Sequence, residues 1–303
     1  MDNRLPDYNL RIPDGSGHLL RDALNVDVTA TGSVKTREGY SVAFAGTDAH
    51  SGWQGDGFAL YCDAGTIYRL DDGMQRTVVA AGFGMTTPVR YTQVNEAVYF
   101  TDGIRVGSYH PDTGPTPMWT DGLELTVADQ ALTPMPPGQC IAHHNARLLV
   151  AVGSVLAYSE PFTPHLRDAA KGFEIFPAPI TCLAAVEGGV MVLSDKTYFI
   201  AGGFPAQEVR AVLPYGGPAQ QEGYRDDGGA HWMSARGLCM CDQAGQVSNI
   251  QEQRIALNVT GSAATLFREA DGRNAVVASL SQPGSMAAGI GSYAEARIVR
   301  KDA

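Results

Sequence analysis

Hydrophobic residues in this chain occur in short runs that are separated by turn residues. The clearest example is residues 189–203, where the apolar runs 190–193 and 197–200 flank Ser194-Asp195-Lys196. Runs of β-branched, aromatic and aliphatic residues on either side of a short polar turn predict a β-hairpin. Because both runs are almost continuously apolar, we expect both faces of this hairpin to be covered by other sheets.

The same design recurs along the chain. Six apolar runs, each usually followed by a turn rich in Asp, Gly or Ser and a second run, can be counted from Phe58, Val98, Leu148, Val190, Trp232 and Val276. The steps between them are 40, 50, 42, 42 and 44 residues. Periods of this length with short strands predict a β-propeller-like all-β fold of about six blades. A sandwich or several small barrels is the alternative, since the repeats share no Trp-Asp or Gly-His signature.

Two regions depart from the repeat. Residues 1–45 contain proline and Gly-Ser-Gly turns and an alternating strand around Leu24, and we expect an N-terminal arm whose strands at 21–42 close the ring against 274–280 or 294–299. Residues 46–303 are then a single propeller-like domain. Six of the 17 prolines lie at 111–138, which predicts a long rim insertion between blades.

Charge and hydropathy limit the possible partners. The formal net charge is −10, and the densest basic cluster is only Arg297 to Lys301, so we expect no sequence-specific nucleic-acid binding. An acidic surface would instead repel a polyanion such as DNA. No run approaches the 18 or more apolar residues of a membrane span, and the N-terminus does not resemble a signal peptide. We therefore expect no membrane insertion, and localisation in a cytoplasm or in a particle assembled there.

The residues that could carry chemistry have structural explanations. All five cysteines lie in or near apolar segments and are expected to be reduced core residues, with Cys239 and Cys241 on one face of a strand. His143 and His144 should point to opposite faces, one buried and one exposed. The recurrent Asp-Gly pairs are typical of turns. We therefore predict no catalytic residue, no metal site and no cofactor.

Three further segments carry specific expectations. Trp53, in the polar loop 46–57, is predicted to fold back as a core plug rather than to anchor a neighbouring subunit. Residues 165–170 suggest a short helical turn that ends at Gly172. The glycine-rich stretch 202–230 is interpreted as blade connections.

A resemblance to a known group becomes visible in three passages. The run from Arg21 to Tyr40, R-D-A-L-N-V-D-V-T-A-T-G-S-V-K-T-R-E-G-Y, resembles the opening of bacteriophage tail β-propeller proteins of the nozzle or packaged-DNA stabilisation type. The passages 156–176 and 180–205 are also similar to that group. The resemblance implies a non-enzymatic virion protein that forms a ring around the DNA passage. Its implied partners are copies of itself, portal or adaptor proteins, and tail fibres or a needle.

Two other classes of function remain open. A cytoplasmic propeller enzyme of the lactonase or glycan-lyase type would need acids gathered at the central channel, and the repeats supply none at matching positions. A monomeric carbohydrate-binding module would be supported if Trp53, Trp119 and Trp232 lay on loops.

Overall fold

The computed structural model describes residues 26–28, 34–36, 44–119, 132–205, 207–225, 227–251, 259, 261–270, 273–281 and 298–299. The chain divides into two compact units, Met1–Phe44 with Glu269–Arg273 and Ala45–Arg268 with Asn274–Ala303. The described residues form strands and turns and contain no helix. The predicted all-β class is therefore confirmed.

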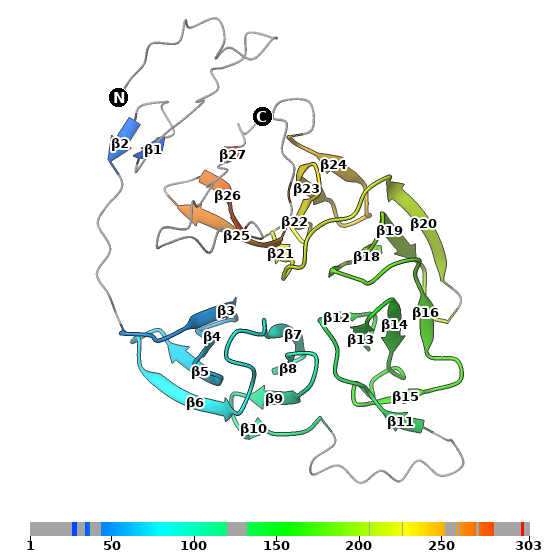
Figure 1. Ribbon diagram of the computed structural model, residues 1–303, viewed down its shortest axis with the longest axis horizontal. Coiled ribbons are helices and arrows are strands. Elements are labelled where there is room, and N and C mark those ends of the chain that lie inside the picture. The colour runs from blue at the N-terminus through cyan, green and yellow to red at the C-terminus, as the bar shows by residue number, and fades with distance from the viewer. Residues whose placement is uncertain are drawn as a thin grey trace, which may run out of the picture. The chain divides into compact units, whose positions relative to one another are not determined.

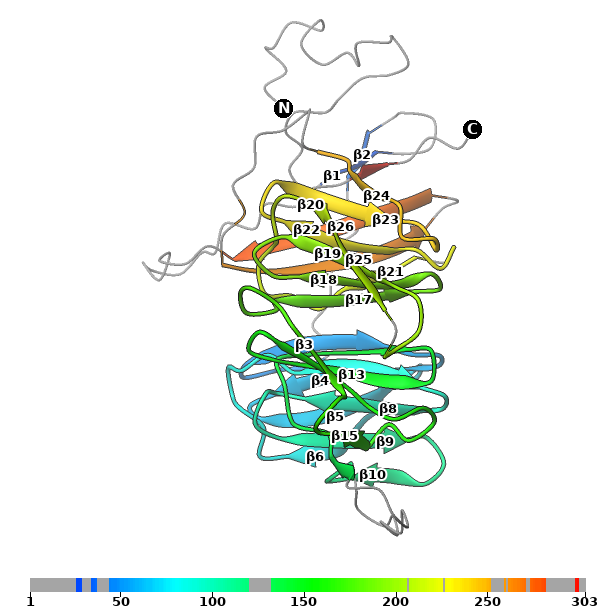
Figure 2. The same ribbon diagram turned by 90° about the vertical axis from the view of Figure 1, so that its right-hand side faces the viewer.

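The larger unit consists mainly of antiparallel sheets that follow one another along the chain (Figures 1 and 2). Sheet 1 contains β3 (Ala49–Gln54), β4 (Phe58–Asp63), β5 (Thr66–Asp71) and β6 (Arg76–Ala81). Sheet 2 contains β7 (Arg90–Val94), β8 (Ala97–Thr101), β9 (Val106–His110) and β10 (Gly114–Thr116). Sheet 3 contains β12 (Cys140–His144), β13 (Arg147–Val152), β14 (Val155–Tyr158) and β16 (Phe173–Ile175).

The remaining sheets repeat this order. Sheet 4 contains β17 (Cys182–Val186), β18 (Gly189–Leu193), β19 (Thr197–Ala201) and β20 (Glu208–Leu213). Sheet 5 contains β21 (Gly223–Tyr224), β22 (Ala230–Ser234), β23 (Gly237–Cys241) and β24 (Val247–Asn249). Sheet 6 has three described strands, β25 (Ser262–Ala270), β26 (Arg273–Ser281) and β27 (Ile298–Val299). The succession of short-stranded sheets confirms the propeller-like repeat read from the sequence.

The central hairpin of sheet 4 forms as its sequence predicts. Strands β18 and β19 pair with Leu193 opposite Thr197, and the Ser194 N–H donates to the Lys196 carbonyl at 2.8 Å to close the turn. Every residue of β18 is buried. A fully buried strand needs apolar side chains on both of its faces, and this explains the continuous run of hydrophobic residues.

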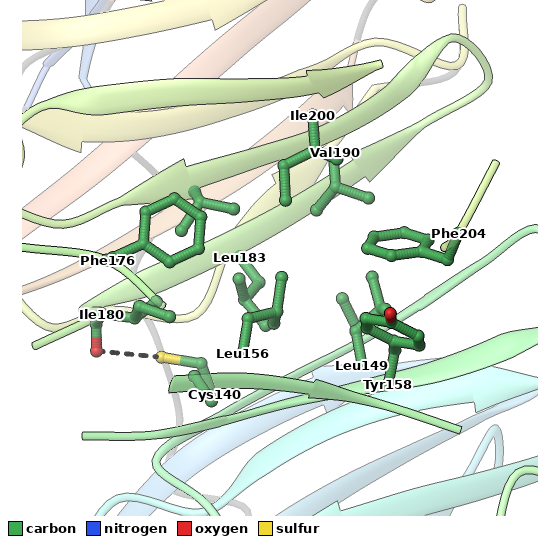
Figure 3. Packing of buried hydrophobic residues seen from close by; sticks show 13 residues of the cluster. Cys140, Leu149, Leu156, Tyr158, Phe176, Ile180, Leu183, Val190, Ile200 and Phe204 are labelled. Carbon is green, nitrogen blue, oxygen red and sulfur yellow. Dashed lines mark hydrogen bonds between the residues drawn. The ribbon is translucent and has the colours of Figure 1, made fainter. Parts of the chain in front are cut away.

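The core lies between consecutive sheets rather than in one central mass. Figure 3 shows the layer between sheets 3 and 4, where Leu149 and Leu156 face Leu183 and Val190. Equivalent apolar layers join sheets 1 and 2, 2 and 3, 4 and 5, and 5 and 6. The middle strands of sheets 2 to 5 therefore contribute one face to each of two layers. This alternation is the physical basis of the repeat.

Cysteine residues and Trp53 occupy the places expected of core residues. All five cysteines are buried and outside disulfide bonds, and Cys239 and Cys241 lie in the same apolar layer. Trp53 is half-buried against Phe58, with ring centroids 5.8 Å apart, and against Tyr91 at 6.4 Å. The core-plug prediction for Trp53 is confirmed.

Other expectations for the loops need correction. The helical turn predicted at 165–170 is wrong, because Leu166–Asp168 form strand β15, which pairs with β11 (Leu132–Pro134). The proline-rich insertion is not purely loop: β10 and β11 lie at sheet edges, where prolines cost no ladder hydrogen bond, and 120–131 lie outside the described residues. The stretch 202–230 contains the outer strand β20 and the short strand β21 in addition to connections.

Only two short strands of the N-terminal segment are described. Strands β1 (Val26–Val28) and β2 (Val34–Thr36) pair antiparallel with each other, as the predicted turn between them requires. In the described part of sheet 6, β26 pairs with β27. Ring closure by residues 21–42 stays a prediction.

Removing a buried side chain from the layer between sheets 3 and 4 should cause a large loss of stability. Leu183 is fully buried, so Leu183→Ala should lower the free energy of unfolding by about 2–5 kcal/mol through lost burial and the cavity left behind. Ile104 is 78% exposed, and Ile104→Ala should change it by at most about 0.5 kcal/mol. Urea unfolding measures both, and equal losses would contradict the layered core.

Candidate functional site

The first strands of the sheets bring several polar side chains to the middle of the larger unit. Strands β7, β12 and β21 lie around this middle in Figure 1, and β12 packs beside both β7 and β17. The segment leading into β21 carries two adjacent glutamines and a glutamate, Gln220, Gln221 and Glu222.

Each of these glutamines pairs with both backbone groups of one residue. The Gln221 amide accepts from the Tyr91 N–H at 3.1 Å and donates to the Tyr91 carbonyl at 3.3 Å, which ties sheet 5 to sheet 2. Gln220 accepts from the Met233 N–H at 2.7 Å and donates to the Met233 carbonyl at 2.6 Å. A primary amide has the same donor and acceptor pair as a peptide group, so each side chain acts like one more residue of a β-ladder.

Glu222 is an ionisable group in a nearly dry environment. Its side chain is buried, and burial raises the pKa of the Glu222 carboxyl to about 8. A hydrogen bond from its own backbone, the attraction of Arg90 and the hydroxyl of Tyr224, which donates at 3.3 Å, only partly oppose this rise. The Ala185 N–H donates in turn to the Tyr224 hydroxyl at 3.3 Å, which links the carboxyl to sheet 4. At neutral pH Glu222 is mostly protonated.

Arg90 supplies the positive charge of this centre. It is 9% exposed, and its Nε atom has no hydrogen-bond partner. Its charge lowers the pKa of Glu222 and also that of the thiol of Cys140, the first residue of β12. Burial outweighs that attraction and raises the pKa of Cys140 to about 12, and the pKa of Cys182 is also raised well above its usual value. Neither thiol is a nucleophile at neutral pH.

This arrangement holds sheets together through side-chain hydrogen bonds. The glutamine bridge crosses the middle, and the ionisable groups are buried in their less reactive protonated forms. Within the described residues, no group of three or more His, Cys, Asp and Glu side chains is placed to hold a metal ion. The polar side chains at the centre therefore link sheets 2, 4 and 5.

The residues considered in the sequence have mixed outcomes. Asp102 forms a turn as expected, with its carboxylate accepting from the backbone of Ile104 at 2.9 Å and Arg105 at 2.7 Å. The expectation of one buried and one exposed histidine is wrong: both side chains are half-buried and line one cavity, although His143 and His144 are paired in regular register with β13. Asp121 and Asp271, of two further Asp-Gly pairs, lie outside the described residues.

The three tryptophans do not form a binding surface on loops. Trp232 lies in β22 and is fully buried. Trp119 is 4% exposed and donates its indole N–H to the Gly107 carbonyl at 2.8 Å. Trp53 lies in β3, packed as described above. The observation that would have favoured a carbohydrate-binding module through these rings is absent.

Sequence reasoning missed Arg90, Gln221 and Glu222. The available signal was the run Gln220-Gln221-Glu222 just before a strand, where polar side chains must find partners if the strand is buried. The pairing of Gln221 with Tyr91, 130 residues away, has no local pattern.

Comparison with known proteins supports the fold alone. No protein-family model matches the chain, and no curated protein matches it. Similar solved structures include the extracellular domain of a putative one-component system of B. thetaiotaomicron (TM-score 0.50, 11% identity, covering 80% of this chain and 34% of that chain). PorZ, a surface component of the type-IX secretion system of Porphyromonas gingivalis, has a TM-score of 0.46 at 13% identity, with 81% of this chain and 31% of that chain covered.

The N-terminal domain of Nup159 is a further similar structure, with a TM-score of 0.47, 12% identity, and coverage of 77% of this chain and 73% of that chain. The chain spans about a third of the length of the two bacterial proteins. None of the described segments forms a helix suited to crossing a membrane. At these identities, the likeness is one of fold.

Burial of Glu222 predicts a pH-dependent stability. Between the pKa of the unfolded chain, near 4.5, and the folded value of about 8, the folded protein holds a proton that the unfolded chain has lost. Stability therefore falls as pH rises through this window, by at most about 1.4 kcal/mol per pH unit. Glu222→Gln replaces the neutral carboxyl by an amide of nearly the same shape that does not titrate, so the variant should lose about 2 kcal/mol less stability than the parent between pH 6 and 8.

Chemical unfolding at a series of pH values measures this difference. Glu208→Gln on the exposed outer strand β20 is the matched control and should follow the parent curve. Parallel curves for the parent and Glu222→Gln would show that Glu222 is ionised in the folded protein.

Proposed function

We propose that the chain is a structural, non-enzymatic virion protein of a tailed phage. It would be a subunit of a ring at the tail nozzle, the head-to-tail junction or the tail tip, forming part of the DNA passage and helping to retain packaged DNA. Its neighbours would be further copies of itself, portal or adaptor proteins, and tail fibres or a needle. The support from sequence is the resemblance of 21–40, 156–176 and 180–205 to phage tail propeller proteins.

The observation that carries this proposal is the bridged centre of the larger unit. Gln221 and Tyr91 join sheets 5 and 2 across the middle, and buried thiols and a buried carboxyl surround them. A propeller enzyme would use this position for an accessible site, whereas a structural subunit needs it rigid. DNA would then pass between subunits of a ring and not through the middle of one subunit.

Exposed apolar side chains on outermost strands support assembly with neighbours. Val78 on β6 is 57% exposed, Ile175 on β16 is 64% exposed, and Val209 on β20 is 37% exposed. These strands are the outer edges of sheets 1, 3 and 4. Exposed apolar residues and open sheet edges are typical of surfaces that another protein covers. The net charge of −10 would reduce sticking of DNA to the ring.

The enzyme alternative and a carbohydrate-binding module built on the three tryptophans now have less support. Glu222 is the acid that the structure places at the centre, and it is protonated and enclosed rather than open to substrate. The tryptophans are packed in or against the core.

The proposal predicts that the protein is part of the phage particle. Quantitative peptide mass spectrometry of density-purified, DNA-filled particles from the source culture should find the chain at a fixed ratio to the portal protein, at about six or twelve copies as expected for a closed ring. A soluble host protein of similar size and abundance serves as the carry-over control. Recovery of the chain only in the soluble fraction would refute the virion assignment.

A further inference from the structure

A polar depression lies on the face of the larger unit that carries the turns between first and second strands. One cavity of about 340 Å³ is lined by residues of sheets 3, 4 and 5, including His143, His144, Asn145, Glu187, Gly228 and Gln243. A second cavity of about 410 Å³ shares His144, Asn145 and Glu187. These volumes are at the lower end of the range of small-molecule sites, about 300–1,000 Å³.

The walls of the depression are tied to one another. The Gly188 N–H, in the turn between β17 and β18, donates to the Gln243 carbonyl at 2.7 Å and so links sheet 4 to sheet 5. The His144 ring hydrogen-bonds the backbone of Val186, linking sheet 3 to sheet 4. The Gln243 amide donates to the Asp227 carbonyl at 2.6 Å. A site held in this way is preformed, which reduces the ordering cost of binding.

Most side chains that line the depression are uncharged and can both donate and accept hydrogen bonds. Burial lowers the pKa of His143 and His144, so both imidazoles are uncharged at neutral pH and each carries one donor and one acceptor. Asn145 and Gln243 add amides of the same dual character. Glu187 is the acidic residue of the lining and disfavours an anionic ligand. Hydroxyl groups, which also donate and accept at once, match this set.

An exposed aromatic residue, Phe162, is joined through its backbone to the turn that lines the depression. Phe162 is 88% exposed, and its N–H donates to the Ala146 carbonyl at 2.8 Å, one residue after the cavity-lining Asn145. Phe162, Ala146 and Asn145 have φ angles of 58°, 60° and 48°. For Phe and Ala this left-handed conformation costs about 1 kcal/mol or more, so the loop holds an unfavourable geometry that leaves an aromatic ring in solvent.

We propose that this depression binds an uncharged saccharide, whose hydroxyl groups bond to His143, His144, Asn145 and Glu187 while a ring face packs on Phe162. The inference rests on the cavity and its lining and does not depend on the virion role. In a phage tail, such a site would contact a glycan of the host surface. It is distinct from the three tryptophans, which are packed in or against the core.

Saturation-transfer NMR with the full-length chain tests the proposal. The probes are glucose, galactose, mannose, N-acetylglucosamine, maltose and lactose, with glucuronate as an anionic comparison. We expect saturable transfer to at least one neutral sugar and weaker transfer to glucuronate. Phe162→Ala should weaken binding about tenfold, the equivalent of about 1.4 kcal/mol. Asn145→Gly, which keeps a residue suited to the left-handed turn, should weaken it about threefold to tenfold.

The matched control is Ile104→Ala, in the turn between β8 and β9 and therefore away from the lining residues. It should bind as the parent does, and circular dichroism should show that all variants are folded. The absence of transfer to every neutral sugar overturns the proposal, as does binding that neither Phe162→Ala nor Asn145→Gly changes. Preference for glucuronate, or binding of a lysine-rich peptide that Glu187→Gln abolishes, would assign the depression to a different ligand class. None of these results affects the mass-spectrometric test of whether the chain is part of the phage particle.

Discussion

The structure depends on apolar contact between the faces of successive sheets. A single four-stranded sheet of this size cannot cover both of its own faces, and the middle strands β13, β18 and β22 are buried almost throughout. The sheets that contain these strands are therefore stable only with a neighbour on either side, as in other repeat architectures. This requirement explains why the hydrophobic runs recur at a nearly constant interval, and why connections absorb the variation in length.

Because the sheets are arranged around a common centre, their first strands come close together there. The backbone polar groups of these strands then need hydrogen-bond partners. Main-chain groups there must find partners without water, and Gln220 and Gln221 supply them by presenting amides in place of peptide groups. Arg90 and Glu222 remain in the same environment at an electrostatic cost, which is reduced because the carboxyl stays protonated. Hydrogen bonds consequently hold the centre in place. The surfaces that could bind a ligand or a neighbouring protein lie at the turns and on the outer strands.

The sequence predicted the fold well because burial on both faces leaves a periodic signal. The hairpin at 189–203 and the spacing of the six runs were sufficient for the class and the approximate number of sheets. Edge strands such as β10, β15 and β20 were missed or read as loop or helical turn, since few of their residues contact a core. The candidate sites were not predictable: Gln221 meets Tyr91, and His144 meets Glu187, only after distant turns are brought together.

The bond between Gln221 and Tyr91 has a consequence for the order in which the chain is built. Sheets 2 and 5 are separated by 130 residues at this contact, with sheets 3 and 4 between them. During synthesis from the N-terminus, Gln221 becomes available to the main chain of Tyr91 in β7 only after the segment that leads into sheet 5 has emerged from the ribosome. Closing so large a loop is entropically unfavourable until the intervening layers have formed. We therefore expect the hydrogen bonds between Gln221 and Tyr91 to form late in folding, after sheets 3 and 4 have packed.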